Sequence, residues 1–234
     1  MLIEKEFWSY KAQGFNLVPI WKKVNLFQLP TSIDVYKFFS ERKQDFLFEI
    51  KQKNHDNLTQ RYSIIGLQSD QWFIINNERV EEYEKSELVN TVFTPDPINE
   101  FLQQTKRWKV PKISSLPTFL GVFFGFFNTE CTKLHQPTIQ KIDQYKEHES
   151  HSCAIQWLTK NLIILDHTEQ NIYCITHLKT DTIQDYVEGY QYLASLSQKL
   201  EIFLSFINQS QQKNTPVEKI NLYKNQDSEY KNIQ

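Results

Sequence analysis

Two β-branched runs in the last third of the chain constrain the fold most strongly. Residues 161–167 (NLIILDH) and 171–177 (NIYCITH) are separated only by the residues TEQ. Runs of this composition so close together predict a β-hairpin. The chain must therefore build at least part of an antiparallel sheet.

A long amphipathic helix is predicted directly after this hairpin, from about residue 182 to residue 206. Thr182 and Asp185 can form a capping box at its start. Its apolar side chains recur every three or four residues, as one helical face requires. They are Ile183, Val187, Tyr190, Leu193, Leu196, Leu200, Phe203 and Ile207. Hairpin and helix together indicate an α+β fold, with antiparallel β-sandwich-like sheets and flanking helices.

Shorter segments predict two further helices. Residues 31–42 should form a helix with Thr31 or Ser32 as its N-cap. Its apolar face would carry Ile33, Tyr36 and Phe39. Asp96 and Pro97 predict the start of another helix, because an acidic cap followed by proline suits the first turn.

The strands expected between these helices are short. Residues 45–50 (DFLFEI) indicate a buried strand, and residues 51–57 (KQKNHDN) indicate a polar turn. Residues 60–76 contain two apolar runs joined at residues 66–69, which predicts another hairpin.

Composition excludes several classes of protein. Hydrophobic residues make up 40% of the 234 residues, and the formal net charge is −2. The first value provides for a core, and the second gives no electrostatic reason to expect nucleic acid or an anionic membrane as a partner. The longest apolar run covers residues 119–127, whereas a membrane-spanning helix needs about 20 residues. The N-terminus lacks the apolar centre of a secretory signal, and the three cysteines form no Cys-x-x-Cys pair. We therefore expect reduced thiols and a cytoplasmic location.

Candidate metal ligands gather in one polar region. Cys131, His135, His148, His151 and Cys153 offer zinc-binding side chains. Their spacing matches no standard zinc motif, so no metal site is predicted.

Two other groups of residues also favour structural roles. The run 106–109 (KRWK) mixes basic and aromatic side chains, but it stands where a helix C-terminus attracts cations. Asp166 and His167 could be half of a catalytic relay. Without a nearby nucleophile, a turn-forming cap is the preferred interpretation. No catalytic residue is predicted.

Several segments, taken in order, resemble one enzyme family. They are NLVPIWKKV (16–24), TSIDVY (31–36), FLFEI (46–50), RYSIIG (61–66), LPTFLGVFFGFF (116–127) and LIILDH (162–167). Together they resemble the N-terminal domain of anthranilate synthase component I. Departures from the family pattern include Ser32 for a proline, Ile50 for a serine, and Val122 and Phe126 for a glycine and a tyrosine.

The resemblance implies a division of the chain and a set of partners. Residues 1–208 would form the N-terminal domain, and residues 209–234 a polar linker leading to a chorismate-binding domain that the chain lacks. The complete lyase would convert chorismate and glutamine to anthranilate, pyruvate and glutamate, with Mg²⁺ in that absent domain and no cofactor in this chain. The implied partners are a chorismate-binding domain or polypeptide and glutamine amidotransferase component II. The aromatic run 119–127 would then leave apolar surface for the partner to cover.

The resemblance also implies a binding site. Leu47, Phe48, Glu49, Ile50 and Arg61 would line an allosteric tryptophan pocket, in which Arg61 could hold the amino-acid carboxylate at two points. Alternatively, Arg61 is an edge-strand residue that pairs with Glu49 or lies in solvent.

Two other functions stay open at this point. The chain could belong to aminodeoxychorismate synthase component I of the folate pathway, although that family more often has aspartate where Ser63 stands. It could also be a free-standing amino-acid-binding or interaction module without catalysis.

Overall fold

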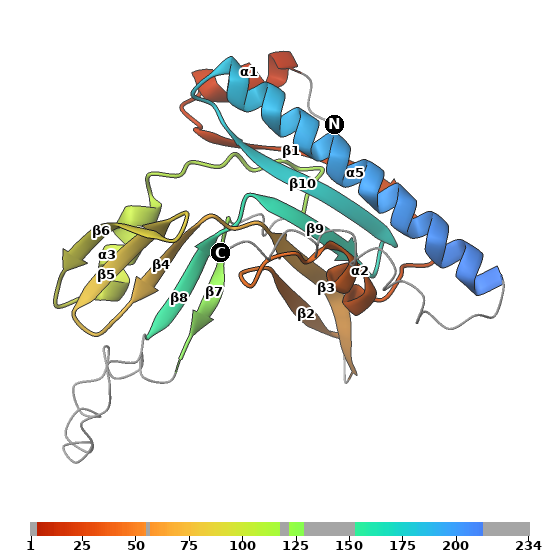
Figure 1. Cartoon of the computed structure of the whole chain (residues 1–234), viewed down its shortest axis with the longest axis horizontal. Helices are drawn as coiled ribbons and strands as arrows, with labels where there is room; N and C mark the ends of the chain where they lie inside the picture. Colours follow the sequence, from red (N-terminus) through yellow and green to blue (C-terminus); the bar gives the residue numbers. More distant parts are fainter. Residues whose placement is uncertain (1–3, 55–56, 118–121, 129–152, 213–234) are drawn as a thin grey trace, which may run out of the picture.

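The chain folds into two antiparallel sheets with helices packed against them (Figure 1). The computed structural model describes residues 4–54, 57–117, 122–128 and 153–212. In these ranges the helices are α1 (Glu4–Ala12), α2 (Ser32–Phe39), α3 (Pro97–Thr105) and α5 (Ile183–Gln212). The predicted α+β class with antiparallel strands is confirmed.

Each sheet has five strands within the described residues. Sheet A has the order β1-β10-β9-β3-β2, and sheet B has the order β6-β5-β4-β8-β7. The strands of sheet A are β1 (Leu17–Asn25), β2 (Phe46–Asn54), β3 (Asn57–Leu67), β9 (Asn161–Asp166) and β10 (Asn171–Lys179). Those of sheet B are β4 (Gln71–Ile75), β5 (Arg79–Glu84), β6 (Glu87–Phe93), β7 (Phe123–Phe127) and β8 (Ala154–Leu158).

The hairpin and capped helix predicted in the last third of the chain are confirmed. β9 and β10 pair antiparallel, and Thr182 and Asp185 form the capping box, with Asp185 N donating to Thr182 Oγ1 over 3.1 Å. α5 packs on β10 and β1 and buries Leu193, Leu196, Leu200 and Phe203. Its first turns differ from the prediction: Ile183 and Val187 are exposed. Gly189 instead faces the sheet, because an added Cβ would lie 1.8 Å from Leu178 Cδ2.

Helix α2 begins as predicted and ends earlier. The Thr31 side chain accepts from Asp34 N, so Thr31 is the N-cap, but the backbone is already extended at Ser40. Ile33 was wrongly assigned to the buried face, since it is 54% exposed and Val35 is buried instead.

The first two strands of the expected central region form one long hairpin. β2 runs to Asn54 and β3 starts at Asn57, so most of the predicted turn 51–57 is strand. Lys51 and Gln52 are exposed in β2, so their polarity did not indicate a turn.

The hairpin predicted over residues 60–76 is wrong. β3 pairs with β2 and β9 in sheet A, whereas β4 pairs with β5 and β8 in sheet B. Gly66 does not form the turn. It lies within β3 under the ring of Phe46, and an added Cβ would stand 2.2 Å from Phe46 Cζ.

The two sheets differ in how they are covered. Helices α2 and α5 join sheet A in a single large hydrophobic cluster. Sheet B has α3 on one face, where Phe73, Phe101 and Phe123 pack together. The sheets meet where Phe46 contacts Phe124 and Trp157.

The last described helix runs past the predicted domain boundary. α5 continues to Gln212, and the boundary predicted at residue 208 stays a prediction.

Within the described residues, no helix is both long enough and apolar enough to cross a membrane.

Candidate functional site

The five predicted site residues lie on two faces of sheet A. Directly opposed residues on antiparallel strands share a face. Glu49 opposes Ser63, and Ile50 opposes Tyr62, which in turn opposes Asp166. Leu47 and Glu49 therefore point to the α2 side, and Phe48 and Ile50 to the other side.

The α2 side holds its two residues in place. Ser32 Oγ, in the first turn of α2, donates to Glu49 Oε1 over 2.8 Å. Leu47 packs against the cluster that contains Val35 and Phe39. These two positions therefore connect β2 to the start of a helix.

Arg61 lies at an irregularity in the ladder. The register shifts between Ile50 and Lys51, which leaves Arg61 as an extra residue on β3. Its Nη2 donates to the Tyr62 hydroxyl over 3.0 Å and lies 3.4 Å from Asp166 Oδ2. Its guanidinium carbon stands 4.7 Å from the centre of the Tyr62 ring. These contacts bring Arg61 to the face that carries Ile50.

The alternative interpretation of Arg61 needs correction. β3 lies inside sheet A rather than at its edge, and the carboxylate that Arg61 meets is that of Asp166, where the sequence offered Glu49. Nor is the side chain left in solvent, since it is only 22% exposed. The bulge turns Arg61 towards β9, which the local sequence could not indicate.

Asp166 is a turn cap, as predicted. Its Oδ1 accepts from Thr168 N and Glu169 N, both over 3.0 Å. A hydroxyl does lie beside the neighbouring histidine: Ser63 Oγ is 2.8 Å from His167 Nε2. However, Ser63 is completely buried, and burial lowers the pKa of His167. This pair therefore stabilises the junction of β3 and β9.

The described residues contain no group of three or more potential metal ligands. Cys131, His135, His148 and His151 lie outside these residues, so the prediction for them stays untested. Cys153 is buried, with its Sγ 2.8 Å from Asn77 Oδ1, and neither Cys153 nor Cys174 forms a disulfide.

The basic run 106–109 follows α3 directly, as the helix-end interpretation requires. Arg107 forms an ion pair with buried Glu82 and stacks 3.9 Å from the Trp108 ring. Arg107 therefore joins α3 to sheet B.

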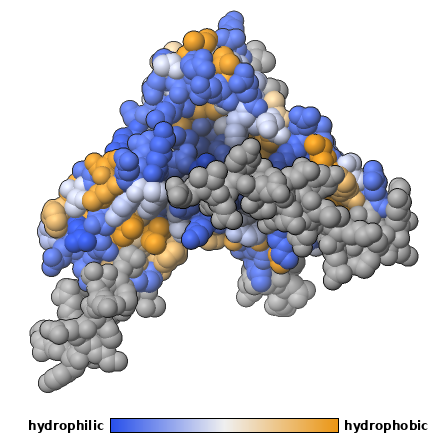
Figure 2. All heavy atoms as spheres, viewed as in Figure 1, coloured by the Kyte–Doolittle hydropathy of each residue, from blue (hydrophilic) through white to orange (hydrophobic). Residues whose placement is uncertain are grey.

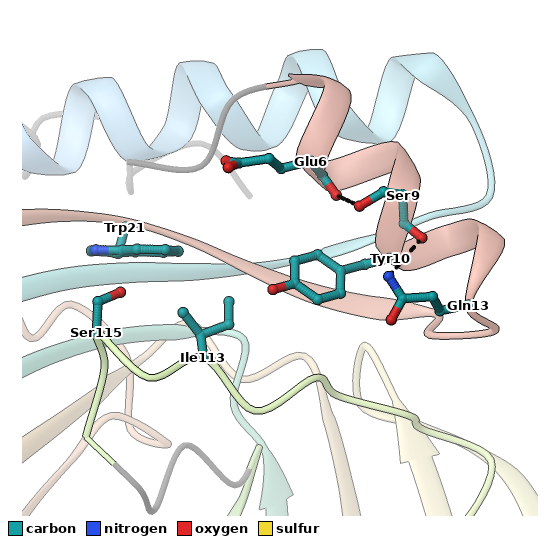
Figure 3. A pocket seen from close by; sticks show the side chains of 7 residues that line it. All are labelled: Glu6, Ser9, Tyr10, Gln13, Trp21, Ile113 and Ser115. Carbon is teal, nitrogen blue, oxygen red and sulfur yellow. Dashed lines mark hydrogen bonds between the residues drawn. The ribbon is translucent and has the colours of Figure 1, made fainter.

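A cavity of about 510 Å³ lies elsewhere, between α1, β1 and the segment after α3 (Figure 3). It is lined by Glu6, Ser9, Tyr10, Gln13, Trp21, Ile113 and Ser115. Sequence reasoning missed this cavity, and also the roles of Tyr62 and Asp166 beside Arg61. No local motif joins these residues, because each set comes from separate strands or segments.

The chain is similar to several known proteins, although it matches no family model. It is 24% identical to anthranilate synthase component 1 of Acinetobacter calcoaceticus over 200 residues, which are 83% of this chain and 39% of that protein. It is 28% identical to the Neisseria gonorrhoeae protein of the same name over 56% of this chain and 26% of that protein. A Schizosaccharomyces pombe protein named probable anthranilate synthase component 1 is 23% identical over 75% of the chain.

The matched region is the N-terminal part of these relatives. The chain spans between 26% and 39% of the length of the relatives from Acinetobacter and Neisseria. By sequence, the chain is thus a relative of the N-terminal part of proteins named anthranilate synthase component 1.

Proposed function

We propose that the chain is the regulatory and structural N-terminal portion of an anthranilate synthase component I, acting in the cytoplasm in tryptophan biosynthesis. The observation that carries this proposal is similarity over 83% of the chain to a protein of that name. In the complete enzyme, chorismate and glutamine would give anthranilate, pyruvate and glutamate. This chain would supply no catalytic residue.

The regulatory site would be built around Arg61. Its guanidinium is positioned by Tyr62 and Asp166, and a guanidinium suits two-point binding of an amino-acid carboxylate. Phe48 and Ile50 lie on the same face of the sheet and would contact the ligand's ring. Leu47 and Glu49, fixed against α2, would hold β2 in position behind them.

Ile50 should weaken tryptophan binding. Its side chain is 38% exposed and can neither donate nor accept a hydrogen bond, whereas the related family carries serine at this position. A lost hydrogen bond to a charged ligand group costs about 1.5–3 kcal/mol, or roughly a tenfold to hundredfold loss of affinity. An enzyme assembled from this chain should therefore resist feedback by tryptophan.

Calorimetry with tryptophan on the assembled protein tests this site. Ile50→Ser should raise the affinity by at least roughly tenfold. Arg61→Gln should abolish binding, and Lys51→Ser, one residue beyond the bulge, should change nothing. Tight binding by the unaltered protein, with no gain from Ile50→Ser, would refute the proposed site.

The face of sheet B opposite α3, which sheet A covers in part where Phe46 contacts Phe124 and Trp157, would dock the catalytic partner. Register places Phe124, Trp157, Trp72, Tyr83 and Leu88 in one row across all five strands. We call this row, with Phe126 and Ile155 beside it, the aromatic face. Trp72 and Tyr83 stack with centroids 5.5 Å apart, and Leu88 and Phe126 are about half exposed, at 52% and 48%.

This surface has the chemistry of an interface. Helix α3 contacts β4 and β5, and it packs on the opposite face, against Phe73 and Val80. Figure 2 shows hydrophobic groups over the sheet B region within a largely hydrophilic surface. Exposed apolar and aromatic patches of this kind mark protein interfaces.

The occupant we propose is the chorismate-binding domain or polypeptide. It would hold chorismate and Mg²⁺, with ammonia delivered by glutamine amidotransferase component II. No observation favours the folate-pathway alternative, since each relative compared above carries the anthranilate synthase name.

A further inference from the structure

The cavity under α1 has the size and the setting of a small-molecule site. Its volume of about 510 Å³ lies within the range of roughly 300–1,000 Å³ that ligand pockets occupy. In Figure 3, Glu6 and Tyr10 extend from α1 towards the end of the cavity where Trp21 lies. Ile113 and Ser115 form the opposite wall, from the segment after α3.

The α1 wall of this cavity is held in place. Phe7, next to Glu6, is completely buried. The centre of its ring lies 5.0 Å from that of Trp8 and 4.9 Å from that of Tyr186. Lys11 Nζ donates to Asp181 O over 3.2 Å and so ties α1 to the segment that leads into α5.

The opposite wall is anchored through Asn16. Its Nδ2 donates to Arg107 O over 2.6 Å, and its Oδ1 accepts from Lys109 N over 2.7 Å. These bonds fix the start of the segment that carries Ile113 and Ser115. The cavity is therefore formed before any ligand arrives, and binding need not order either wall.

The lining residues carry groups that attract positive charge. It contains one carboxylate, Glu6, and two aromatic rings, Tyr10 and Trp21, together with hydroxyl and amide groups. No lysine, arginine or histidine is among the seven lining residues. A cation close to an aromatic ring is attracted by the ring's quadrupole, and a carboxylate adds to that attraction.

Two lysines near the lining, Lys11 and Lys22, contact other groups. Lys11 lies 5.2 Å from the Trp8 ring, and Lys22, next to Trp21, pairs with Glu201 over 2.6 Å. Neither lysine is among the lining residues.

We propose that this cavity binds a small organic ammonium compound with an aromatic or apolar body. The ammonium group sits between Glu6 and the ring of Trp21 or Tyr10, and the body packs against Ile113. This site is separate from Arg61, which suits a carboxylate, so the proposal does not depend on the proposed tryptophan site.

Three probes of similar shape and different charge test the proposal. Benzylammonium, benzyl alcohol and phenylacetate are titrated into the full chain, with amide NMR shifts followed at Tyr10, Gln13 and Ile113. For a ligand of this size we expect a Kd on the order of 1 mM for benzylammonium. The alcohol should bind more weakly, and phenylacetate should give no shifts at these positions.

Charge substitutions at an exposed position sharpen the test. Glu6→Gln should weaken benzylammonium binding by roughly threefold or more. Glu6→Lys should abolish it and make the cavity accept phenylacetate. Glu4→Gln and Glu4→Lys, on the same helix outside the cavity, are the matched controls and should leave all three probes unchanged.

The opposite results are equally clear. If benzylammonium shifts no lining residue, or if phenylacetate binds the unaltered chain as well as benzylammonium does, the assignment is wrong. It is also wrong if the Glu4 and Glu6 variants behave alike.

Discussion

Sheet A and sheet B contain five strands each in the described part of the chain, but they are buried to very different degrees. In β9 and β10 nearly every residue is buried, whereas β6 is exposed over most of its length. The reason is visible in Figure 1, where α5 lies along β10 and β1 while sheet B carries only the short α3 among the described helices. We therefore expect sheet A to provide most of the stability and sheet B to offer a surface for binding.

The sequences of the strands reflect this difference in burial. β9 and β10 are almost continuous β-branched and apolar runs, as strands covered on both faces require. β5, with the sequence RVEEYE, alternates between buried and half-buried residues. In a strand such as β5, the buried side chains hold the strand in the sheet. The residues on its outer face can therefore vary to suit a binding partner.

The largest expected effect comes from matched truncations in the two sheets. Ile164 is completely buried in β9, and Ile155 is half-buried in β8 on the aromatic face. Ile164→Ala should lower the free energy of unfolding by about 3–4 kcal/mol, and Ile155→Ala by about 1 kcal/mol. Chemical denaturation measures both. Equal losses would mean that the two sheets do not differ in the way proposed.

We expect low pH to destabilise sheet A because of His177. Burial lowers the pKa of this side chain in β10 to about 4, against 6.5 for an unperturbed histidine. Between these values the unfolded chain takes up a proton that the folded chain does not. The free energy of unfolding should therefore fall as the pH drops from about 6.5 to about 4, by at most roughly 3 kcal/mol. His177→Gln should flatten the pH dependence in this window, and an unchanged slope would contradict the assignment.

A smaller effect is expected at the start of the helix that covers sheet A. Thr182→Ala removes one half of the capping box and should cost about 1 kcal/mol. Gln184→Ala, exposed in the same turn, is the matched control and should cost less than about 0.5 kcal/mol. Thermal unfolding of the two variants separates the effects, and equal losses would argue against the cap.

The sequence correctly predicted those elements that are determined by residues close together in the chain. The hairpin of β9 and β10, the Thr182 cap, the Thr31 cap and the Asp96 helix start are all of this kind. Strands β5 and β6 were missed, because their charged residues hide the strand pattern.

The errors arose where distant segments decide the structure. Gly66 was predicted to lie in a turn, but a glycine is needed there because the ring of Phe46 leaves no room for a Cβ. The strands on either side of the predicted turn, β3 and β4, belong to different sheets. In the candidate site, the residue types on β2 and Arg61 could be named from the sequence. The partner of Arg61 could not, because Asp166 reaches it only through the pairing of β3 with β9.

The proposed role of the aromatic face in anthranilate synthesis is tested most directly by reconstitution. The remaining part of the Acinetobacter calcoaceticus relative, beyond the matched region, is mixed with this chain, chorismate, ammonia and Mg²⁺, and anthranilate fluorescence is recorded. The controls are each polypeptide alone and the variant Phe27→Arg, at a fully exposed residue outside the aromatic face.

We expect anthranilate from the mixture and none from this chain alone. Leu88→Arg combined with Phe126→Arg should reduce the rate by more than roughly tenfold, because buried charge at an interface is costly. Phe27→Arg should leave the rate unchanged. Anthranilate formation by the chain alone, or an equal rate with and without the two arginines, would contradict the proposed role.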